Sequence, residues 1–286
     1  MRSFHIIVIS LAVLASASAF DLFDDLEDIS FMPVEPSLLT SRIIGGKNAT
    51  FNDFPYQAGL LMNKSGSGSW CGGVLISDKY VLTAAHCAKG ADYIDVYLGA
   101  KEIRNLEEEG RLNLRVNASN IVVHAAYNAT DIRNDIAILK LPQTVNISEQ
   151  IKPVDLPSYS DAAQDFSGRS VIASGWGRTN DEPGSTISPV LRYAEVFVQP
   201  ESVCRYYFGQ YILSSNICTE TAYGQGICNG DSGGPVVIQR GEKRTLLGLS
   251  SFVSSRGCVK CWPSVFVRVS YFLDWIAQHS DIQISL

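Results

Sequence analysis

The sequence lacks an excess of basic residues, internal repeats and low-complexity tracts. It contains 23 Lys and Arg residues against 29 Asp and Glu residues, and its formal net charge at pH 7 is −6. This balance does not provide the basic surface with which proteins bind nucleic acids. With 46% hydrophobic and 18% charged residues over 286 positions, the composition is that of a globular protein with one large domain, or two small domains that share a core.

Long apolar runs are also missing, with one exception at the N-terminus. A run that begins at Ile6 is almost entirely apolar, follows Arg2, and ends before the small residues Ala17 and Ala19. This pattern predicts a secretory signal peptide over residues 1–19, cut after Ala19. A membrane anchor would need roughly 20 apolar residues, so we expect a secreted, extracellular protein without a membrane span.

Residues 20–42 differ in composition from the rest of the chain. They contain six acidic residues and one basic residue, Arg42, while Pro33 and Pro36 disfavour regular structure. We interpret this stretch as an extended activation pro-segment. Removal of the signal peptide and of this acidic segment would leave a nearly neutral protein body.

Secretion changes how the seven cysteines are interpreted. In an oxidising compartment most of them should form disulfides, and the odd number leaves one over. Asn-x-Ser/Thr sequons become candidate glycosylation sites on surface loops. The sequons begin at Asn48, Asn63, Asn117, Asn128 and Asn146.

The rest of the chain alternates short β-like runs with turn residues. Gly, Pro, Asn and Asp separate these runs, a spacing that favours an all-β barrel or sandwich over alternating strands and helices. One helix is predicted at the end, where apolar residues follow the helical period from Phe272 to His279 and Ser270 is available as N-cap. The clearest β-like runs are Val74–Ile76, Asp95–Leu98, Asn120–Val123, Ile136–Leu139, Val171–Ala173, Val236–Ile238, Leu246–Leu249 and Val265–Val269.

Histidine is scarce, which narrows the search for a catalytic base. A serine hydroxyl needs a neighbouring base with a pKa near the working pH, and a third group that orients this base. After the signal peptide the chain has three histidines. His124 lies in a strand-like run, where a surface or packing role suits it better, and His279 lies on the predicted helix. His86 lies beside Cys87, which could pin its backbone.

Three motifs occur in a fixed order along the chain. They are LTAAHC at residues 82–87, NDIA at 134–137 and GDSGGP at 230–235. Together with WCGG at 70–73 and SGWG at 174–177, they make the sequence resemble the chymotrypsin family of serine endopeptidases, from Ile43 to the terminal helix. Motif matches of this length are rarely accidental.

The resemblance implies a Ser-His-Asp triad. Ser232 would be the nucleophile, His86 the general base and then acid, and Asp135 the carboxylate that holds the imidazole. The backbone N–H groups of Gly230 and Ser232 would form the oxyanion hole, which binds the negative charge that develops on the scissile carbonyl. Ser251 matches the family serine that supports the buried aspartate.

The fold implied by the resemblance is all-β. It consists of two six-stranded antiparallel β-barrels with a C-terminal α-helix, and the triad lies between the barrels. Within the protease domain, residues 43–286, the expected parts are the N-terminal barrel at about 43–150, the C-terminal barrel at about 151–269 and the helix at about 270–280.

Two other interpretations use the same residues. GDSGGP also satisfies the G-x-S-x-G pattern of α/β-hydrolases, and Asp274 and His279 follow in that family's order. There the serine opens a helix, whereas Pro235 and the β-branched residues after it predict a strand. The second alternative is a non-catalytic serine-protease homologue that acts by binding partners. By the resemblance such homologues usually lack a triad residue, and all three are present.

The stretch SRIIGG at residues 41–46 resembles the family's activation junction. Cleavage after Arg42 would free the amino group of Ile43, and the resemblance implies that this ammonium group pairs with Asp231. Pairing would relieve the cost of burying a lone carboxylate. It would thereby order the oxyanion hole and the specificity pocket.

The resemblance also implies a disulfide pattern in which Cys261 stays unpaired. Alternatives remain open, because Cys261 could replace Cys258 as the partner of Cys228 or could link to another chain. No cysteine is placed to tether the pro-segment, so it should leave after cleavage. The implied pairs are Cys71–Cys87, Cys204–Cys218 and Cys228–Cys258.

The specificity pocket can also be inferred from the resemblance. Gly226 stands where trypsin-like relatives carry an aspartate, so cleavage after Lys or Arg is disfavoured. Val253 and Ser264 match the pocket walls, and Ser251 is a further expected substrate-binding residue. We expect a neutral, apolar pocket that accepts Phe, Tyr, Leu or smaller side chains. The stretches 97–100 and 251–258 look most like arthropod chymotrypsin-like and collagenolytic, brachyurin-type enzymes.

The implied chemistry requires no cofactor, because serine, imidazole and carboxylate suffice. We expect no structural calcium, since Ala100 stands where calcium-binding relatives carry a carboxylate, and we interpret Glu107–Glu109 as a solvated face. The resemblance implies protein and peptide substrates, an activating trypsin-like protease, and serpins or other protein inhibitors as partners. We expect a monomer that binds neither nucleic acid nor membrane.

Overall fold

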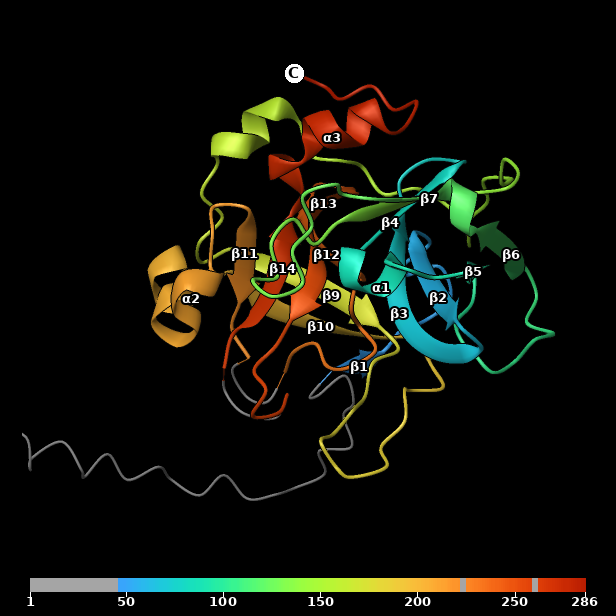
Figure 1. Ribbon diagram of the computed structural model, residues 1–286, viewed down its shortest axis with the longest axis horizontal. Coiled ribbons are helices and arrows are strands. Elements are labelled where there is room, and N and C mark those ends of the chain that lie inside the picture. Colours follow the sequence, from blue (N-terminus) through green and yellow to red (C-terminus); the bar gives the residue numbers. More distant parts are fainter. Residues whose placement is uncertain (1–45, 222–224, 259–261) are drawn as a thin grey trace, which may run out of the picture. The chain divides into compact units, whose positions relative to one another are not determined.

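The computed structural model describes residues 46–221, 225–258 and 262–286 (Figure 1). The expected signal peptide, the pro-segment with its Arg42–Ile43 junction, and Cys261 lie outside the described residues. All described residues belong to one contact unit, Thr40–Leu286. Two antiparallel β-sheets, each of seven strands within the described ranges, carry its fold.

The first sheet comes from the N-terminal half of the described chain. Its strands are β2 (Gln57–Lys64), β3 (Ser67–Leu75), β4 (Tyr80–Thr83), β5 (Tyr93–Leu98), β6 (Leu112–Asn117), β7 (Ile121–Val123) and β8 (Ala137–Lys140), in the order β6-β5-β2-β3-β4-β8-β7. In β5, Ile94, Val96 and Leu98 are buried and alternate with partly exposed residues, as a strand with one core face requires. Ser65 and Gly66 both have positive φ and close the β2–β3 hairpin in the manner of a type I′ turn.

The second sheet contains one strand from the start of the protease domain. Its strands are β1 (Lys47–Asn48), β9 (Ser170–Gly175), β10 (Arg192–Phe197), β11 (Asn216–Thr219), β12 (Pro235–Arg240), β13 (Lys243–Phe252) and β14 (Ser264–Arg268), in the order β1-β10-β9-β12-β13-β14-β11. β1 pairs with β10, whereas the sequence assigned this segment to the N-terminal barrel. The predicted all-β architecture is confirmed, and each sheet holds seven strands rather than six, because short edge segments such as β1 also pair.

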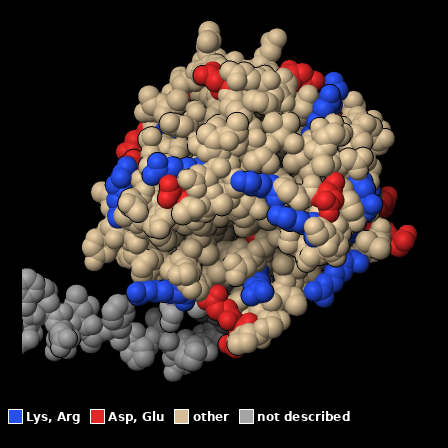
Figure 2. Space-filling view, viewed as in Figure 1, with Lys and Arg blue, Asp and Glu red and all other residues tan. Residues whose placement is uncertain are grey.

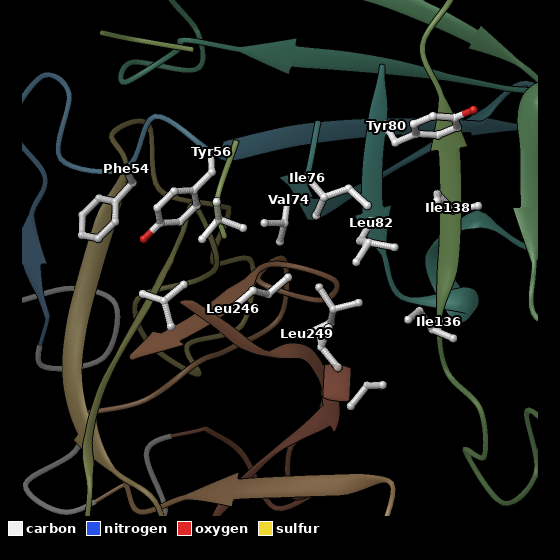
Figure 3. Close-up of a cluster of buried hydrophobic side chains, with 14 of the residues drawn as sticks. Phe54, Tyr56, Val74, Ile76, Tyr80, Leu82, Ile136, Ile138, Leu246 and Leu249 are labelled. Atoms are coloured by element: carbon white, nitrogen blue, oxygen red, sulfur yellow. The ribbon is translucent and has the colours of Figure 1, made fainter. Parts of the chain in front are cut away.

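The two sheets pack against each other across an apolar core (Figure 3). Figure 3 shows Val74, Ile76 and Leu82 on one side of this core and Leu246 and Leu249 on the other. All five side chains are buried. Full burial of one such side chain stabilises a fold by roughly 1.5–3 kcal/mol. The core therefore fixes the sheets relative to each other and sets the positions of the loops at their junction.

Helices are short and lie outside the sheets. They are α1 (Ala85–Ala88) after β4, α2 (Glu201–Phe208) after β10 and α3 (Leu273–Gln278) near the C-terminus (Figure 1), with 3-10 turns η2 (Ala118–Asn120), η3 (Tyr159–Ala163), η4 (Gly209–Tyr211) and η6 (Val269–Tyr271). No helix in the described part of the chain is long and apolar enough to cross a membrane.

The C-terminal helix begins later than the sequence predicts. α3 starts at Leu273, its N-cap residue is Phe272, and no side chain caps it. Ser270 lies in η6, where its hydroxyl accepts a hydrogen bond from Arg268 Nε at 3.1 Å. The prediction of Ser270 as N-cap is therefore wrong, because a 3-10 turn precedes the helix. Phe272 and Ile276 are buried, as the periodicity indicates, and Leu273 completes the buried face. Of the other two periodic residues, Trp275 is partly buried and His279 is exposed.

Charged side chains on the face shown in Figure 2 lie in small, separate groups of either sign. Uncharged surface occupies most of the area between these groups. This distribution on the visible face agrees with the nearly neutral body inferred from the sequence.

Candidate active site

His86 is carried by α1, directly after β4. The disulfide Cys71–Cys87 joins α1 to β3 and so fixes the backbone that carries the imidazole. The His86 side chain is 32% exposed. The ring is therefore accessible in part, while the rest of it is in contact with the protein.

Asp135 holds this imidazole. Its Oδ2 lies 2.8 Å from His86 Nδ1, and its Oδ1 accepts a hydrogen bond from the His86 backbone N–H at 2.9 Å. The hydroxyl of Ser251 donates to Oδ2 at 2.6 Å. Because a carboxylate can only accept, His86 Nδ1 carries the proton and Nε2 is left as the acceptor. The Asp135 side chain is fully buried, which protects these bonds from water.

The backbone conformation of residue 134, just before Asp135, explains why the NDIA motif begins with an asparagine. Asn134 has φ 52°, and its side-chain amide donates to Ala126 O at 2.9 Å. The Ile136 N–H donates back to Asn134 O at 2.8 Å. Asparagine tolerates this left-handed conformation better than most residues. The turn places Asp135 two residues before β8, which begins at Ala137.

Ser232 lies in the loop between the Cys228–Cys258 disulfide and β12. Its carbonyl accepts a hydrogen bond from Gly72 N–H at 2.8 Å. The same oxygen lies 3.7 Å from the sulfur of Cys87, the residue after His86. The serine loop therefore packs against the histidine loop. Among the residues that the structure describes, the Ser232 hydroxyl itself forms no hydrogen bond.

The glycine after Ser232 makes this close packing feasible. Gly233 has φ 76°, a conformation that favours glycine. A Cβ at this position would lie 2.2 Å from Thr83 Oγ1 and 2.6 Å from Gly72 O. Any side chain at residue 233 would thus force the serine loop away from the segment that leads into α1.

Two neighbouring backbone donors beside the serine are open. Within the described part of the chain, the N–H groups of Gly230 and Ser232 donate to no other residue. The N–H groups of Asp231, Gly233 and Gly234, by contrast, all donate to backbone carbonyls. Gly230 has φ 101°, which keeps its peptide in an orientation that other residues rarely adopt. Open backbone N–H groups are the kind of donor that can bind an oxyanion.

Asp231 is buried between the serine loop and the loop that follows β9. Its carboxylate accepts hydrogen bonds from Gly177 N–H at 2.7 Å and Cys228 N–H at 2.9 Å. Burial raises its pKa to about 6, and these two hydrogen bonds lower it only in part. None of the described residues forms an ion pair with it. The surroundings of Asp231 therefore provide hydrogen-bond donors for its carboxylate, and the described donors are neutral backbone groups.

A cavity of about 300 Å³ opens beside Ser232. Apolar groups in its lining include Ile227, Phe252, Val253 and the Cys228–Cys258 disulfide, and several serines, Ser251 among them, complete it. Two of the expected pocket residues, Val253 and Ser251, thus line the same cavity as Ser232.

The other two expected pocket residues, Gly226 and Ser264, are buried next to each other. A Cβ at Gly226 would lie 3.3 Å from Ser264 Oγ and 2.8 Å from Thr221 Cγ2. Neither Gly226 nor Ser264 belongs to the described lining of the cavity. The structure therefore brings Gly226 and Ser264 together, and it is the neighbouring Ile227 that faces the cavity.

Asp181 is a cavity residue that the sequence analysis missed. Its carboxylate accepts a hydrogen bond from Cys258 N–H at 3.0 Å, and it occupies the space that a side chain at Gly257 would need. It contributes the one charged group to the described cavity lining. No motif marks Asp181, because the contact joins two loops that are far apart along the chain.

Comparisons with known proteins agree with this geometry. The protein-family model for trypsin matches residues 43–276. The chain belongs to the trypsin family. Brachyurin from Leptuca pugilator is 38% identical over 240 residues, which cover 84% of this chain and 99% of that protein. Collagenase from Hypoderma lineatum is 38% identical over 247 residues, 86% of this chain and 90% of that protein.

A solved structure supports the same assignment. The structure described as HL collagenase is similar to this chain with a TM-score of 0.75 and 36% sequence identity, covering 84% of this chain and 100% of that one. The predicted chymotrypsin-like fold, two curled antiparallel sheets and a short C-terminal helix, is confirmed. The trypsin-family chain is a serine endopeptidase.

The α/β-hydrolase alternative does not fit this trypsin-family fold. Ser232 is followed by strand β12 rather than by a helix. Asp274 accepts a hydrogen bond from the Tyr159 hydroxyl at 2.8 Å, and His279 lies at the end of α3 with Nδ1 2.8 Å from a backbone carbonyl. His124 packs against the aromatic rings of the α3 segment, the packing role expected for it.

Three disulfides join the pairs that the resemblance implies. Two groups of potential metal ligands lie close together among the described residues, and each contains two cysteines. These cysteines are disulfide-bonded and offer no thiolate to a metal ion. The disulfides are Cys71–Cys87, Cys204–Cys218 and Cys228–Cys258.

The acidic run after Ala100 is only partly a solvated face. Glu107 and Glu109 are exposed, but Glu108 is buried. Its carboxylate accepts hydrogen bonds from the backbone N–H groups of Lys101 at 2.9 Å and Glu102 at 3.1 Å. The prediction of a solvated face is therefore wrong for Glu108, because this side chain closes its own loop.

The predicted glycosylation sites differ in exposure. Four of the five sequon asparagines are exposed, and the fifth, Asn63, is partly buried on β2. Attachment of glycans stays a prediction at all five positions. The exposed asparagines are Asn48, Asn117, Asn128 and Asn146.

Proposed function

We propose that this serine endopeptidase is secreted as a zymogen and, once activated, cuts peptide bonds after apolar residues with Ser232, His86 and Asp135. The observation that carries the proposal is the bonding of Asp135, which accepts from His86 Nδ1 at 2.8 Å and from Ser251 at 2.6 Å. This arrangement leaves Nε2 of the imidazole as a base beside the serine loop. A binding-only homologue would have no need of it.

The proposed reaction has two halves. The Ser232 oxygen attacks the scissile carbonyl while His86 Nε2 takes its proton, and Asp135 stabilises the imidazolium that forms. The N–H groups of Gly230 and Ser232 donate to the carbonyl oxygen as it becomes negative. The imidazolium then gives its proton to the leaving amine. Water repeats the sequence on the acyl-enzyme, with His86 again as base, and frees Ser232.

The preference for apolar residues before the cut is supported by the cavity lining. Ile227, Val253 and Phe252 are apolar, and Gly226 provides no carboxylate at the position where trypsin-like relatives have one. The one charged lining residue, Asp181, is engaged with the Cys258 backbone N–H. Phe, Tyr and Leu are therefore the side chains we propose for this cavity.

The zymogen proposal is supported by Asp231 and by the start of the protease domain. Asp231 is a buried carboxylate with a raised pKa, which an ammonium group would stabilise. Arg192 is 5% exposed, and its guanidinium donates to Gly46 O at 2.5 Å and to Asn48. It thus anchors the chain three residues after Ile43. Cleavage after Arg42 would free an amine on a short tether.

The proposed partners follow from this cycle. They are protein and peptide substrates, a trypsin-like protease that cuts after Arg42, and serpins or other protein inhibitors that occupy the active site. We propose a monomer in the extracellular space.

A serine-directed phosphonate probe tests the proposal. The chain cut after Arg42 should be labelled at Ser232, and Ser232→Ala and uncut Arg42→Gln should take up far less label. An activated wild-type chain that takes up no label would favour the binding-only alternative. Full activity of Arg42→Gln would overturn the zymogen step alone.

Two further measurements address specificity and the amine. Cleavage of a peptide library varied at the residue before the cut should peak at Phe, Tyr or Leu, and a dominant preference for Lys or Arg would refute the pocket assignment.

Activity should fall at alkaline pH, well above the ordinary amine pKa of about 7.7–8, because pairing with Asp231 raises the pKa of the Ile43 amine. A flat alkaline profile would contradict that pairing.

A further inference from the structure

We propose that Asn128 carries an N-linked glycan beside the active site, and that this glycan hinders folded proteins from reaching Ser232 while short peptides still reach it. Asn128 lies in the connection between β7 and β8, residues 124–136, which we call the Asn128 loop. The inference rests on the proposed function, because secretion brings the chain to the glycosylating enzymes and the proposed cleavage gives the glycan its effect.

The Asn128 loop packs against the helix that carries His86. Tyr127, the residue before Asn128, is partly buried. Lys89, the C-cap residue of α1, places its Nζ 5.1 Å from the centre of the Tyr127 ring. The loop also contains Asp135, and burial together with the charge of Asp135 raises the pKa of Tyr127. Asn128 therefore follows a residue that contacts α1 and is affected by the charge of Asp135, which puts the loop at the rim of the active site.

The tip of this loop presents the whole sequon to solvent. Asn128, Ala129 and Thr130 are all exposed. Asn128 and Arg133 exchange backbone hydrogen bonds of 3.1 Å each, which close the tip. Asn128 Oδ1 accepts a hydrogen bond from the Thr130 backbone N–H at 2.8 Å, as in an Asx turn. The turn uses Oδ1, so that Nδ2, the atom that receives a glycan, stays at the exposed tip.

The position of Asn128 differs from those of the other sequon asparagines. Asn48 lies in β1, and Asn63 lies in β2, where it is partly buried. Asn117 ends the edge strand β6, and Asn146 lies in the exposed stretch after β8. Among these five described positions, Asn128 is the one that shares a connection with a residue of the proposed triad. A glycan at Asn128 would therefore stand closest along the chain to the catalytic machinery.

The attachment is a group transfer from a lipid diphosphate-linked oligosaccharide, catalysed by an oligosaccharyl transferase. The bond between the anomeric carbon and the phosphate oxygen of the donor breaks, and a bond between that carbon and Asn128 Nδ2 forms. Nδ2 loses one proton, and the lipid diphosphate leaves. Oδ1 and the second N–H of Nδ2 are retained, so the hydrogen bond from Thr130 and the 3.4 Å contact with Asp131 are compatible with the glycan.

The expected effect is on approach rather than on chemistry. A folded inhibitor of a protease buries about 800 Å² on each partner, so it covers the rim of the active site as well as the cavity. A short peptide needs the cavity and the serine loop alone. A bulky glycan on the Asn128 loop should therefore slow the association of folded proteins and leave the cleavage of short peptides unchanged.

The experiment uses the full chain, secreted from animal cells and cut after Arg42. Peptide mapping after enzymatic removal of N-glycans, which converts a glycosylated Asn to Asp, should show Asn128 modified in the wild type. The two readouts are the association rate constant of a folded protein inhibitor with Leu at its reactive bond and kcat/KM for a short Phe peptide. In Asn128→Gln and in Thr130→Ala the association rate should rise about three- to tenfold, with kcat/KM for the peptide unchanged.

Matched variants separate the glycan from the side chains. Thr130→Ser retains the sequon and should behave like the wild type. Asn146→Gln removes an exposed sequon in another connection and should leave the association rate unchanged. Enzymatic removal of N-glycans should speed association for the wild type and give no further increase for Asn128→Gln, a test that does not depend on the folding of any variant.

The outcomes separate this inference from the proposed function. An unmodified Asn128 in the secreted wild type would overturn the glycan site. A glycan whose removal left inhibitor association unchanged, or changed peptide cleavage equally, would overturn its shielding role. A chain that was not secreted, or an activated wild type that did not cut the peptide, would overturn the proposed function and this inference with it.

Discussion

Asp135 and Asp231 are equally buried, at 1% exposure each, yet their surroundings differ. Asp135 accepts hydrogen bonds from an imidazole, a backbone N–H and a hydroxyl. Asp231 accepts hydrogen bonds from two backbone N–H groups, and burial raises its pKa to about 6. One carboxylate therefore faces a group that can become cationic, and the other, among the described residues, does not.

The difference indicates which half of the site is complete before the proposed activation. The partners of Asp135 all belong to the folded body, so the imidazole is oriented whether or not the chain has been cut. The surroundings of Asp231 lack a cation in the described chain, and the proposed cut supplies one. We infer that activation acts on the loop with Gly230 and Ser232 rather than on the His86–Asp135 pair.

The largest expected effect that tests this comparison is that of Asp135→Asn. The amide would favour the wrong imidazole tautomer, and kcat of the activated enzyme should fall about 10⁴-fold. The measurement is kcat on a chromogenic peptide. Asp95→Asn is the control, because Asp95 pairs with Arg115 at the surface, and its kcat should be unchanged. A loss below tenfold for Asp135→Asn would mean that another group orients His86.

Asp231→Asn should be next in size and should act in two opposite directions. In the cut chain it removes a buried ion pair of about 3–5 kcal/mol, so activity should fall about 10²- to 10³-fold. In the uncut chain, held by Arg42→Gln, it removes an unpaired buried charge, so the free energy of unfolding at pH 8 should rise by about 1–3 kcal/mol. Urea unfolding measures the second effect. An uncut variant less stable than its parent would show that Asp231 already has a cationic partner.

The pH dependence of the uncut chain is the third test. The folded pKa of Asp231, about 6, lies above its ordinary value of 3.8. The folded state therefore binds the proton more tightly, and this group contributes stability below pH 4 that is lost as the pH rises to 6. The contribution is about 3 kcal/mol at most.

Activation should remove this pH dependence, because the amine lowers the pKa of Asp231. Urea unfolding at pH 4, 5, 6 and 7 of Arg42→Gln and of the cut Ser232→Ala chain measures the difference. Parallel profiles for the two chains would contradict a pairing that forms on cleavage.

The smallest effect should come from Ser251→Ala. It removes one hydrogen bond to a charged acceptor, the 2.6 Å bond to Asp135, while His86 Nδ1 and the His86 backbone N–H remain. The expected loss in kcat is about tenfold, with KM nearly unchanged. Ser251→Thr, which retains a hydroxyl, should recover part of the loss. A change in KM alone would indicate that Ser251 acts as a cavity residue only.

The sequence predicted the strands that are rich in β-branched residues and leucine. All eight predicted β-like runs overlap strands, for example Val236–Ile238 with β12 and Leu246–Leu249 with β13. The runs in β12 and β13 are β-branched or leucine-rich and buried on both faces, whereas Asp95–Leu98 in β5 buries alternate residues. β6, with sequence LNLRVN, was missed because it is an edge strand with half of its residues exposed.

Helix α2 was missed for a related reason. Its sequence, ESVCRYYF, buries Cys204 and leaves its aromatic residues partly or fully exposed. Its apolar stripe, made of Val203, Cys204, Tyr207 and Phe208, extends over only two helical turns, which is too short to mark a helix by its period. Its position depends on the Cys204–Cys218 disulfide and on ring contacts with Phe252 and Trp262, which are distant in sequence.

The sequence by itself determined the family, the all-β class and the identity of the residues that the site brings together, because each lies in a short motif whose residue types the chemistry demands. Only the tertiary structure decided the neutral surroundings of Asp231, the burial of Glu108 and the contact of Asp181 with the cavity. These features depend on how separate loops meet once the two sheets have packed. Burial and hydrogen bonding between such loops leave no periodic pattern along the chain.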